Sequence, residues 1–351
     1  MNNLFHGNGV WHSGAGRFFA GLLLLTLLTG CRRDGLVQLY GRAQGTYYSV
    51  QYYDSQRPAR NLQPQVDSLL AAFDQSASLW VDSSLIRRIN AGQTDSLDPI
   101  LHDLLQHSTE VFHYTQGAFN CFVGRIVQEW GFSFREQQEP DSARLQRLLQ
   151  AAHAPVYLSS DHKVIRTDTL TELDFNAIAQ GYASDLVGAL LERYSISDYL
   201  VDIGGEVIAH GTKADGRPWR VGIERPAADS LSAPEVMTAI ELRDASVVTS
   251  GSYRKYYERD GMRFSHTIDP ATGHPVQHTL LSVSVVERES WLADAMATAY
   301  MVMGLDSASA FIHAHAGGPG TGAVYFIYDD HGELKTYATP AFEELTIKAD
   351  I

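Results

Sequence analysis

Residues 172–206 read ELDFNAIAQGYASDLVGALLERYSISDYLVDIGGE, and the apolar pattern changes twice within them. Residues 172–175 form a short apolar run that predicts a strand. Residues 178–194 carry apolar side chains at helical spacing, and residues 199–203 predict a second strand. Helix and strands that follow each other this closely indicate a fold in which both kinds of element pack on one core.

The rest of the chain mixes the same two patterns without a regular alternation of strand and helix. Helical spacing recurs at residues 66–73, 100–114, 142–152, 292–303 and 307–316. Strand patterns occur at residues 47–53, 156–158, 164–167, 219–223, 238–242, 245–249, 281–286 and 323–328. No Gly-x-Gly-x-x-Gly motif follows a strand, which argues against Rossmann-type nucleotide binding. We expect an α+β fold, one large domain of mixed sheets and helices over residues 38–345.

Composition limits the classes of function. Of 351 residues, 44% are apolar, which is enough for a large core. The chain has 41 acidic against 27 basic residues, a formal net charge of −14. Nucleic-acid binding depends on clustered Lys and Arg. This balance therefore argues against a DNA or RNA partner.

The first 30 residues have the pattern of a secretory signal. Arg17 precedes an apolar run at residues 18–28, and residues 28–31 read Leu-Thr-Gly-Cys. A positive flank, a short apolar core and small residues before a cleavage site are typical of a signal peptide. The run is too short to span about 30 Å of hydrocarbon comfortably. Leu-Thr-Gly-Cys also resembles a bacterial lipobox, in which the cysteine becomes the first mature residue and carries lipids.

The lipobox pattern implies where the protein resides. We expect residues 1–30 to be a lipoprotein signal peptide, Cys31 to be lipidated, and residues 31–37 to form a tether. The protein is then exported and anchored to a bacterial lipid membrane, facing the periplasm or the cell exterior. An ordinary secretory signal with an incidental cysteine is the alternative. With Cys31 lipidated, Cys121 has no disulfide partner, which favours a packing role over a catalytic one.

Two segments place chemistry at the ends of apolar elements. Asp174 lies just before the helix of residues 178–194, where unpaired N–H groups often serve a functional carboxylate; an N-cap is the alternative. Gly181 costs this helix about 1 kcal/mol relative to Ala, which close approach of a ligand or of a neighbouring backbone would explain. Gly204 and Gly205 could let backbone N–H groups reach a phosphate, but a tight turn is the simpler explanation.

Two later segments carry further candidates. His266 precedes an Asp-Pro turn in residues 265–273 and could act as a general base; a structural role is the alternative among 14 histidines. Asp294 and Thr298 are four residues apart in an apolar helix, so they share one face. Together they could hold a hard cation such as magnesium, or they could instead cap and back-bond the helix.

Taken in order, these segments and three earlier ones resemble the ApbE family of FAD:protein FMN transferases. The earlier motifs are QGTYY at residues 44–48, SLWVDSSLIRRIN at residues 78–90 and GAFNCFVG at residues 117–124. The resemblance covers roughly residues 38–345. It implies an ApbE-like fold and a site for FAD.

The resemblance implies a role for particular residues. The metal site would use the backbone carbonyl of Ala177 with the side chains of Asp294 and Thr298, and His266 would lie near the reacting phosphates. Residues implied to contact FAD are Gln44, Trp80, Ala118, Phe119, Asn120, Asp174, Gln180 and Ile268. Gln44, Asn120 and Gln180 depart from the commoner family residues. Their amides can still form hydrogen bonds with the substrate.

The activity implied is Mg²⁺-dependent transfer of the FMN part of FAD onto a Thr or Ser hydroxyl, with release of AMP. The acceptor would be an exported redox protein with a short flavinylation motif. One alternative is an FAD pyrophosphatase, in which water replaces the acceptor hydroxyl. Another is an FAD-binding lipoprotein without chemistry. The complete set of metal-ligand candidates argues against the carrier, since storage does not need them.

Overall fold

The computed structural model describes residues 35–132, 140–226, 235–252, 256–259 and 262–347. Cys31, the signal segment and the first part of the tether lie outside these ranges.

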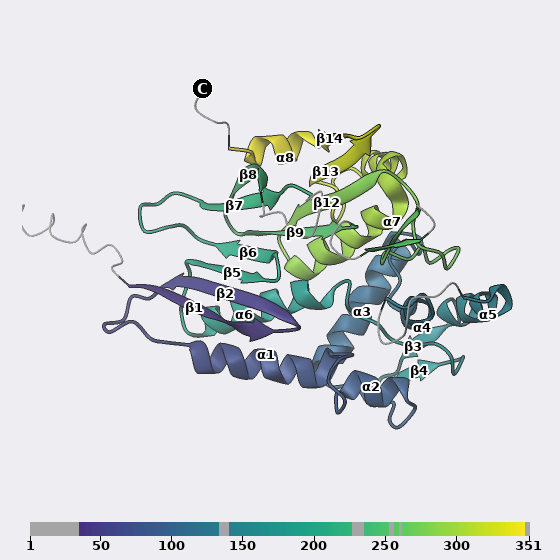
Figure 1. Cartoon of the computed structure of the whole chain (residues 1–351). Helices are drawn as coiled ribbons and strands as arrows, with labels where there is room; N and C mark the ends of the chain where they lie inside the picture. Colours follow the sequence, from purple (N-terminus) through teal and green to yellow (C-terminus); the bar gives the residue numbers. More distant parts are fainter. Residues whose placement is uncertain (1–34, 133–139, 227–234, 253–255, 260–261, 348–351) are drawn as a thin grey trace, which may run out of the picture.

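An antiparallel sheet of eight strands forms the centre of the molecule, in the order β1-β2-β5-β6-β9-β12-β13-β14 (Figure 1). In this order the strands are Leu36–Ala43, Thr46–Tyr53, Tyr199–Ile203, Glu206–His210, Ala245–Gly251, Leu280–Glu287, Ala323–Asp330 and Glu333–Ala338. Each strand is antiparallel to its neighbours. Helices and an antiparallel sheet share one core, which confirms the α+β prediction.

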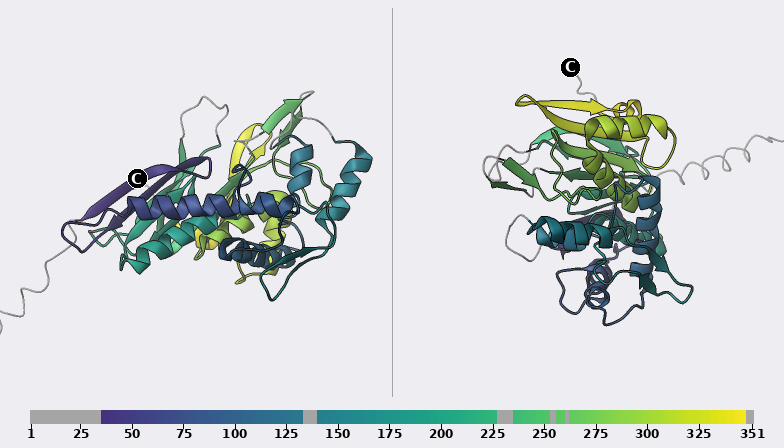
Figure 2. Two further views of the ribbon diagram at one scale, coloured as in Figure 1. Left: turned by 90° about the horizontal axis from the view of Figure 1, so that it is seen from below. Right: turned by 90° about the vertical axis from the view of Figure 1, so that its right-hand side faces the viewer.

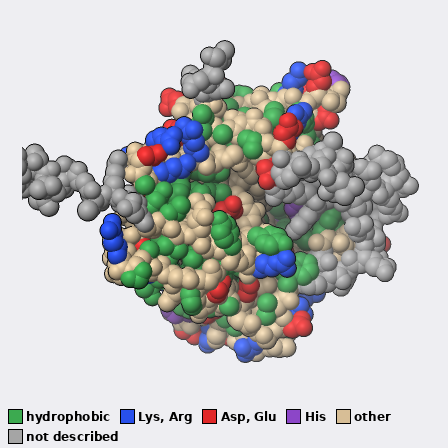
Figure 3. All heavy atoms as spheres, turned by 60° about the vertical axis from the view of Figure 1, so that its left-hand side comes forward, with side chains coloured by type: hydrophobic (Ala, Val, Ile, Leu, Met, Phe, Trp, Pro, Cys, Tyr) green, Lys and Arg blue, Asp and Glu red, His purple; other side chains and the backbone are tan. Residues whose placement is uncertain are grey.

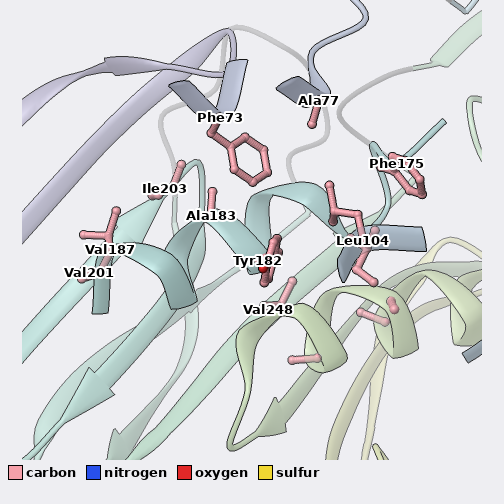
Figure 4. Close-up of a cluster of buried hydrophobic side chains, with 14 of the residues drawn as sticks. Phe73, Ala77, Leu104, Phe175, Tyr182, Ala183, Val187, Val201, Ile203 and Val248 are labelled. Carbon is pink, nitrogen blue, oxygen red and sulfur yellow. The ribbon is translucent and has the colours of Figure 1, made fainter. Parts of the chain in front are cut away.

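Successive residues of β9 point to opposite faces of the sheet and belong to different cores. Val248 packs with the helical layer, which contains α1 (Gln63–Ala77), α3 (Pro99–Tyr114), α6 (Ala179–Arg193) and α7 (Ser290–Ala314). Figure 4 shows Val248 near Tyr182 of α6, with Phe73 of α1 close by. Val247 packs on the other face, against β7 (Trp219–Glu224), β8 (Val236–Leu242) and α8 (Pro340–Leu345).

A smaller lobe lies beside the end of this sheet (Figure 2). It contains α2 (Leu85–Asn90), α4 (Gly124–Glu129), α5 (Ser142–Ala152), β3 (Val156–Leu158) and β4 (Val164–Arg166). β10 (Tyr256–Arg259) and β11 (Met262–Ser265) form a separate hairpin. A third apolar cluster joins Trp130 and Leu148 of this lobe to Ile268. Ile268 is thereby buried against the lobe, close in sequence to His266.

The predicted strand at residues 172–175 is wrong. Glu172 forms only an isolated bridge with Val123. The Leu173 N–H instead donates to Asn90 Oδ1 at 2.9 Å, and Asn90 Nδ2 donates to the Leu173 carbonyl at 2.8 Å. Leu173 and Phe175 are buried, but a side chain satisfies the polar groups of Leu173 that a neighbouring strand would bond.

Other boundaries differ less. β1 begins at Leu36, inside the segment expected to be a tether, and β14 and α8 follow the strand that was expected to close the chain. α7 spans the two predicted late helices and is broken at Gly304, whose φ of 75° is left-handed. α7 is long and apolar enough to cross a membrane by composition, yet it packs on the sheet as a core helix.

On the face in Figure 3, the Lys and Arg side chains of the described residues form small separate groups among acidic and hydrophobic side chains.

Candidate active site

Helix α6 approaches the start of α7 closely at Gly181. The Gly181 N–H donates to Asp294 Oδ2 at 3.0 Å. A Cβ at position 181 would lie 2.4 Å from the Ser290 carbonyl oxygen and 2.8 Å from Asp294 Cβ. Only glycine permits this approach. Of the two explanations that the sequence left open for Gly181, a neighbouring backbone therefore accounts for it.

This contact satisfies one of the N–H groups in the first turn of α6. Gly181 is the third residue after the N-cap Ile178, a position at which the N–H has no acceptor within the helix. It donates to Asp294 instead, and in the described part of the chain no backbone N–H donates to the Ala177 carbonyl. The Ala177 oxygen is therefore available to a ligand, four residues before the glycine that bonds Asp294.

Asp294 is a buried carboxylate with little hydrogen bonding of its own. Its side chain is 5% exposed, and burial raises its pKa from 3.8 to about 7. Thr298, one turn further along α7, is half-buried, and its Oγ1 lies 3.2 Å from Ser250 Oγ. A buried carboxylate is costly unless a cation or a proton neutralises its charge.

These three groups fit magnesium better than a softer metal. All are oxygen donors, and magnesium commonly takes one or two carboxylates, keeps water and binds substrate phosphates. No group of three or more His, Cys, Asp or Glu side chains among the described residues could hold a metal by itself. A cation here would need oxygens of water or of a bound ligand to complete its coordination.

Asp185 also joins α6 to the start of α7, and the sequence did not predict this role. Its Oδ1 accepts from the Ser290 N–H and its Oδ2 from the Trp291 N–H, both at 2.9 Å. The N-cap residue of α7, Glu289, forms no side-chain capping bond, so Asp185 caps α7 from the neighbouring helix. The spacing of Gly181 and Asp185, one turn apart on α6, was the signal available in the sequence.

A second group of polar atoms lies at the turn between β1 and β2. Gln44 adopts a left-handed φ of 53°, and its N–H donates to Asp74 Oδ2 at 3.4 Å. The side-chain Oε1 and Nε2 of Gln44 are buried with no hydrogen-bond partner among the described residues, as is Asp74 Oδ1. Unsatisfied buried polar atoms fit a site that a polar ligand fills.

Gly204 and Gly205 form the turn between β5 and β6, with left-handed φ of 69° and 108°, which confirms the tight turn. A Cβ at Gly204 would lie 2.7 Å from Gln180 Nε2. Gln180 therefore lies over this turn, one residue from Gly181. The implied FAD residues Gln44 and Gln180 come together near these two turns.

The remaining candidates lie towards the smaller lobe. Asn120 is 7% exposed; its Oδ1 accepts from the Phe122 N–H at 2.8 Å and its Nδ2 donates to the Ala152 carbonyl at 3.3 Å. Asp174 accepts the Asn176 N–H at 2.9 Å. That bond closes a turn ahead of α6, whose N-cap residue is Ile178, so Asp174 is not the N-cap of this helix.

Burial decides which atoms of these candidates can meet a ligand. The side chains of Phe119 and Ile268 are 1% and 5% exposed, so they pack in the core and only their backbone could touch a substrate. Ala118 is half-buried. Trp80 is 58% exposed between α1 and α2, where its ring can stack on a flat base. Burial raises the pKa of Asp174 from 3.8 to about 6.

His266 lies just ahead of the predicted turn, which the structure confirms. The Gly273 N–H donates to the Asp269 carbonyl at 2.8 Å, and Thr272 Oγ1 donates to Asp269 Oδ2 at 3.0 Å. His266 is half-buried. The turn is fixed from both sides, because Trp130 Nε1 also donates to the Gly273 carbonyl at 2.8 Å.

Cys121 has the packing role expected of it. It is 3% exposed, and burial raises the pKa of its thiol to about 12, so the reactive thiolate is disfavoured. A surface depression near His278 and Gly304 contains none of the candidate residues.

Comparison with known proteins agrees with the geometry. The model of the ApbE family matches residues 44–319. The FAD:protein FMN transferase of Vibrio cholerae is 33% identical over 343 residues, which cover 93% of this chain and 98% of that protein. The enzyme of the same name from Escherichia coli K12 is 33% identical, with 88% of this chain and 89% of that protein covered.

Solved structures give the same result. The apo flavinyl transferase ApbE of Pseudomonas stutzeri superimposes with a TM-score of 0.77 at 30% identity, covering 90% of this chain and 98% of that one. The flavin transferase ApbE of Vibrio cholerae has a TM-score of 0.76 at 30% identity, covering 88% and 99%. Sequence and fold thus agree over nearly the whole described chain, and this protein belongs to the ApbE family.

Proposed function

We propose that this protein is an Mg²⁺-dependent transferase that moves the FMN part of FAD onto a Thr or Ser hydroxyl of another exported protein and releases AMP. The observation that carries the proposal is the buried Asp294, which accepts the Gly181 N–H, together with the Ala177 carbonyl four residues before Gly181, which accepts no backbone N–H in the described chain. The relatives named FAD:protein FMN transferase supply the reaction class.

The reaction balances as a displacement at phosphorus. The acceptor hydroxyl oxygen forms a bond to the phosphorus on the FMN side, and the bond from that phosphorus to the bridging oxygen breaks. AMP leaves with the bridging oxygen, and His266 accepts the hydroxyl proton. Magnesium held by Ala177, Asp294 and Thr298 would offset negative charge on the phosphate oxygens.

Incubation with FAD, Mg²⁺ and a candidate acceptor tests the proposal. AMP together with flavin bound covalently to the acceptor supports transfer. AMP with free FMN indicates a pyrophosphatase, and FAD binding without AMP indicates a carrier. Removal of Mg²⁺ with EDTA should abolish AMP release, and its return should restore it.

The proposal includes the location of the enzyme at a membrane surface. A lipidated Cys31 would put the enzyme at the membrane surface, together with an exported acceptor. Cys31→Ala should release the protein from the membrane fraction or block its maturation, because stable anchoring depends on the lipid chains. Unchanged fractionation of Cys31→Ala with membranes would refute lipidation at this residue.

A further inference from the structure

The β1–β2 hairpin, purple in Figure 1, carries exposed aromatic side chains at the edge of the sheet. The side chains of Tyr40 and Tyr47 are 61% and 66% exposed, and Leu36, at the start of β1, is 49% exposed. A tyrosine has an apolar ring and a polar hydroxyl, which suits a boundary between an apolar phase and water. These side chains are therefore candidates for contact with a surface outside the protein.

The strand register places the exposed side chains on one face. Tyr40 pairs with Ser49 and Arg42 pairs with Tyr47, and alternate residues of a strand point to the same side. Arg42 Nη2 donates to Tyr47 Oη at 2.7 Å, and the guanidinium lies 4.8 Å from the centre of the Tyr47 ring. We call this surface the outer hairpin face; its residues are Leu36, Gln38, Tyr40, Arg42, Tyr47, Ser49 and Gln51.

The opposite side of the hairpin is buried, which fixes the orientation of the outer hairpin face. Leu39 and Tyr48 belong to the core beneath the helical layer, which includes α7 with Asp294. On the outer side of the sheet, the layer of β7 and β8 reaches Tyr53, whose ring centre lies 6.0 Å from that of Trp219. A flat surface against the outer hairpin face would therefore leave α7 on the far side of the sheet.

The charge of the hairpin differs from the charge of the whole chain. The chain has 41 acidic and 27 basic residues, whereas residues 35–53 contain one basic residue, Arg42, and no acidic residue. An anionic surface repels acidic segments and attracts a nearby arginine. The hairpin is therefore a part of this acidic protein that an anionic surface does not repel.

The proposed lipid anchor is close to this face along the chain. Cys31 and Leu36 are five residues apart, and an extended chain spans at most about 3.3–3.6 Å per residue. Leu36 can therefore lie no more than about 18 Å from Cys31. Lipids on Cys31 would keep the outer hairpin face within reach of the headgroup layer.

We propose that the outer hairpin face docks on the lipid membrane, with Tyr40, Arg42 and Tyr47 in the headgroup region. The proposal rests on the proposed lipidation of Cys31 and names the surface by which the anchored protein meets the bilayer. The tyrosine rings lie where aromatic side chains gather at membrane interfaces, and Arg42 faces lipid phosphates. Docking in this way orients the protein, with the helical layer and Asp294 on the side away from the lipid.

A single fluorescent probe tests this orientation. Cys121 is buried and the pKa of its thiol is raised to about 12, so a cysteine added on the surface reacts selectively with a thiol probe. Gln38→Cys puts the probe on the outer hairpin face. Tyr337→Cys puts it on β14, the strand at the opposite edge of the same sheet. The lipidated protein is placed in vesicles of equal parts phosphatidylethanolamine and phosphatidylglycerol, with or without a lipid that carries a nitroxide on its headgroup.

The nitroxide should quench most of the fluorescence of the probe at position 38 and leave the probe at position 337 almost unchanged. The reason is that a nitroxide quenches only a probe that lies close to it. Equal quenching at the two positions, or no quenching at either, would overturn the proposal.

Variants identify the docking side chains. Tyr40→Ser combined with Tyr47→Ser should remove most of the quenching at position 38, while the lipids on Cys31 still hold the protein on the vesicles. Tyr157→Ser is the matched control, since Tyr157 is 55% exposed on β3 in the smaller lobe, and it should leave the quenching unchanged. Circular dichroism checks that each variant is folded. Undiminished quenching in the double variant would mean that the tether alone brings the hairpin to the lipid, and would refute docking by the tyrosines.

Other occupants of the face give other results. A probe at position 38 that responds to a candidate acceptor protein in detergent, and not to the nitroxide lipid, would assign the face to protein docking. A response to the concentration of the protein itself would assign it to a second copy paired at β1. Either result would overturn the proposal. Failure of the wild-type protein to sediment with the vesicles would instead refute the anchor at Cys31, so the two failures can be distinguished.

Discussion

Replacement of Gly181 by alanine tests the contact that assembles the metal-ligand candidates. The added Cβ would lie 2.4 Å from the Ser290 carbonyl oxygen and 2.8 Å from Asp294 Cβ. Ordinary carbon contacts are about 3.5–4.0 Å, so α7 must move away from α6 by roughly 1 Å. The variant therefore changes the position of Asp294 without changing its chemistry.

Gly181→Ala has stabilising and destabilising effects on the folded state, and the destabilising effects are larger. Alanine favours the helix by about 1 kcal/mol relative to glycine. Overpacking costs about 1–3 kcal/mol, and the lost hydrogen bond from the Gly181 N–H to Asp294 about 1.5–3 kcal/mol. We expect Gly181→Ala to lower the free energy of unfolding by about 1.5–5 kcal/mol. A shift of this size can also weaken a positioned site about 10²-fold.

Urea unfolding and calorimetric titration with Mg²⁺ in the presence of FAD measure the two effects. Gly188→Ala is the matched control on α6, because its Cβ would lie 2.9 Å from Tyr199 Oη, away from Asp294. The control should lose stability and keep its affinity for Mg²⁺. A Gly181→Ala protein that is as stable as the wild type and binds Mg²⁺ equally well would refute the reasoning.

Three further changes test other contacts. Asp185→Asn should weaken Mg²⁺ binding and lower the unfolding free energy by about 1–2 kcal/mol; adding Glu289→Ser, a local N-cap, should restore stability in urea but not Mg²⁺ affinity, and recovery of both would limit Asp185 to capping. The raised pKa of Asp174, about 6 against 3.8, means that the folded state keeps a proton that the unfolded state has lost, so stability falls as pH rises from about 4 to about 6. Asp174→Asn should flatten that slope in unfolding titrations, and an unchanged slope would contradict it. His266→Asn should slow single-turnover transfer by about 10²–10⁴-fold with little change in FAD affinity, whereas a normal rate with weakened binding would assign His266 to phosphate binding.

The sequence predicted the helices and strands whose apolar periodicity is clear within the segment itself. α5 and β5 have the predicted boundaries, α3 differs by one residue at its start, and α6 differs by one residue at each end. The prediction of a strand at residues 172–175 was wrong because the Asn90 side chain forms the hydrogen bonds of the Leu173 N–H and carbonyl. Apolar periodicity records burial and does not record which group bonds the backbone.

In the candidate site, too, residues close together in the chain could be paired from the sequence, and residues far apart could not. Asp294 and Thr298 could be paired from helical spacing alone. Asp185 could not be assigned, because its partners Ser290 and Trp291 are more than one hundred residues away in the chain. Asp74 was missed for a similar reason, since only the folded hairpin brings Gln44 to it.

The central claim concerns where the FMN half of FAD goes, and the stoichiometry of the products measures it most directly. The protein is incubated with FAD, Mg²⁺ and an exported acceptor, and AMP is quantified together with flavin that stays on the acceptor after denaturation. The wild-type protein should give equal amounts of AMP and protein-bound flavin, and Asp294→Asn should give neither. AMP accompanied only by free FMN, or undiminished transfer by Asp294→Asn, would contradict the claim.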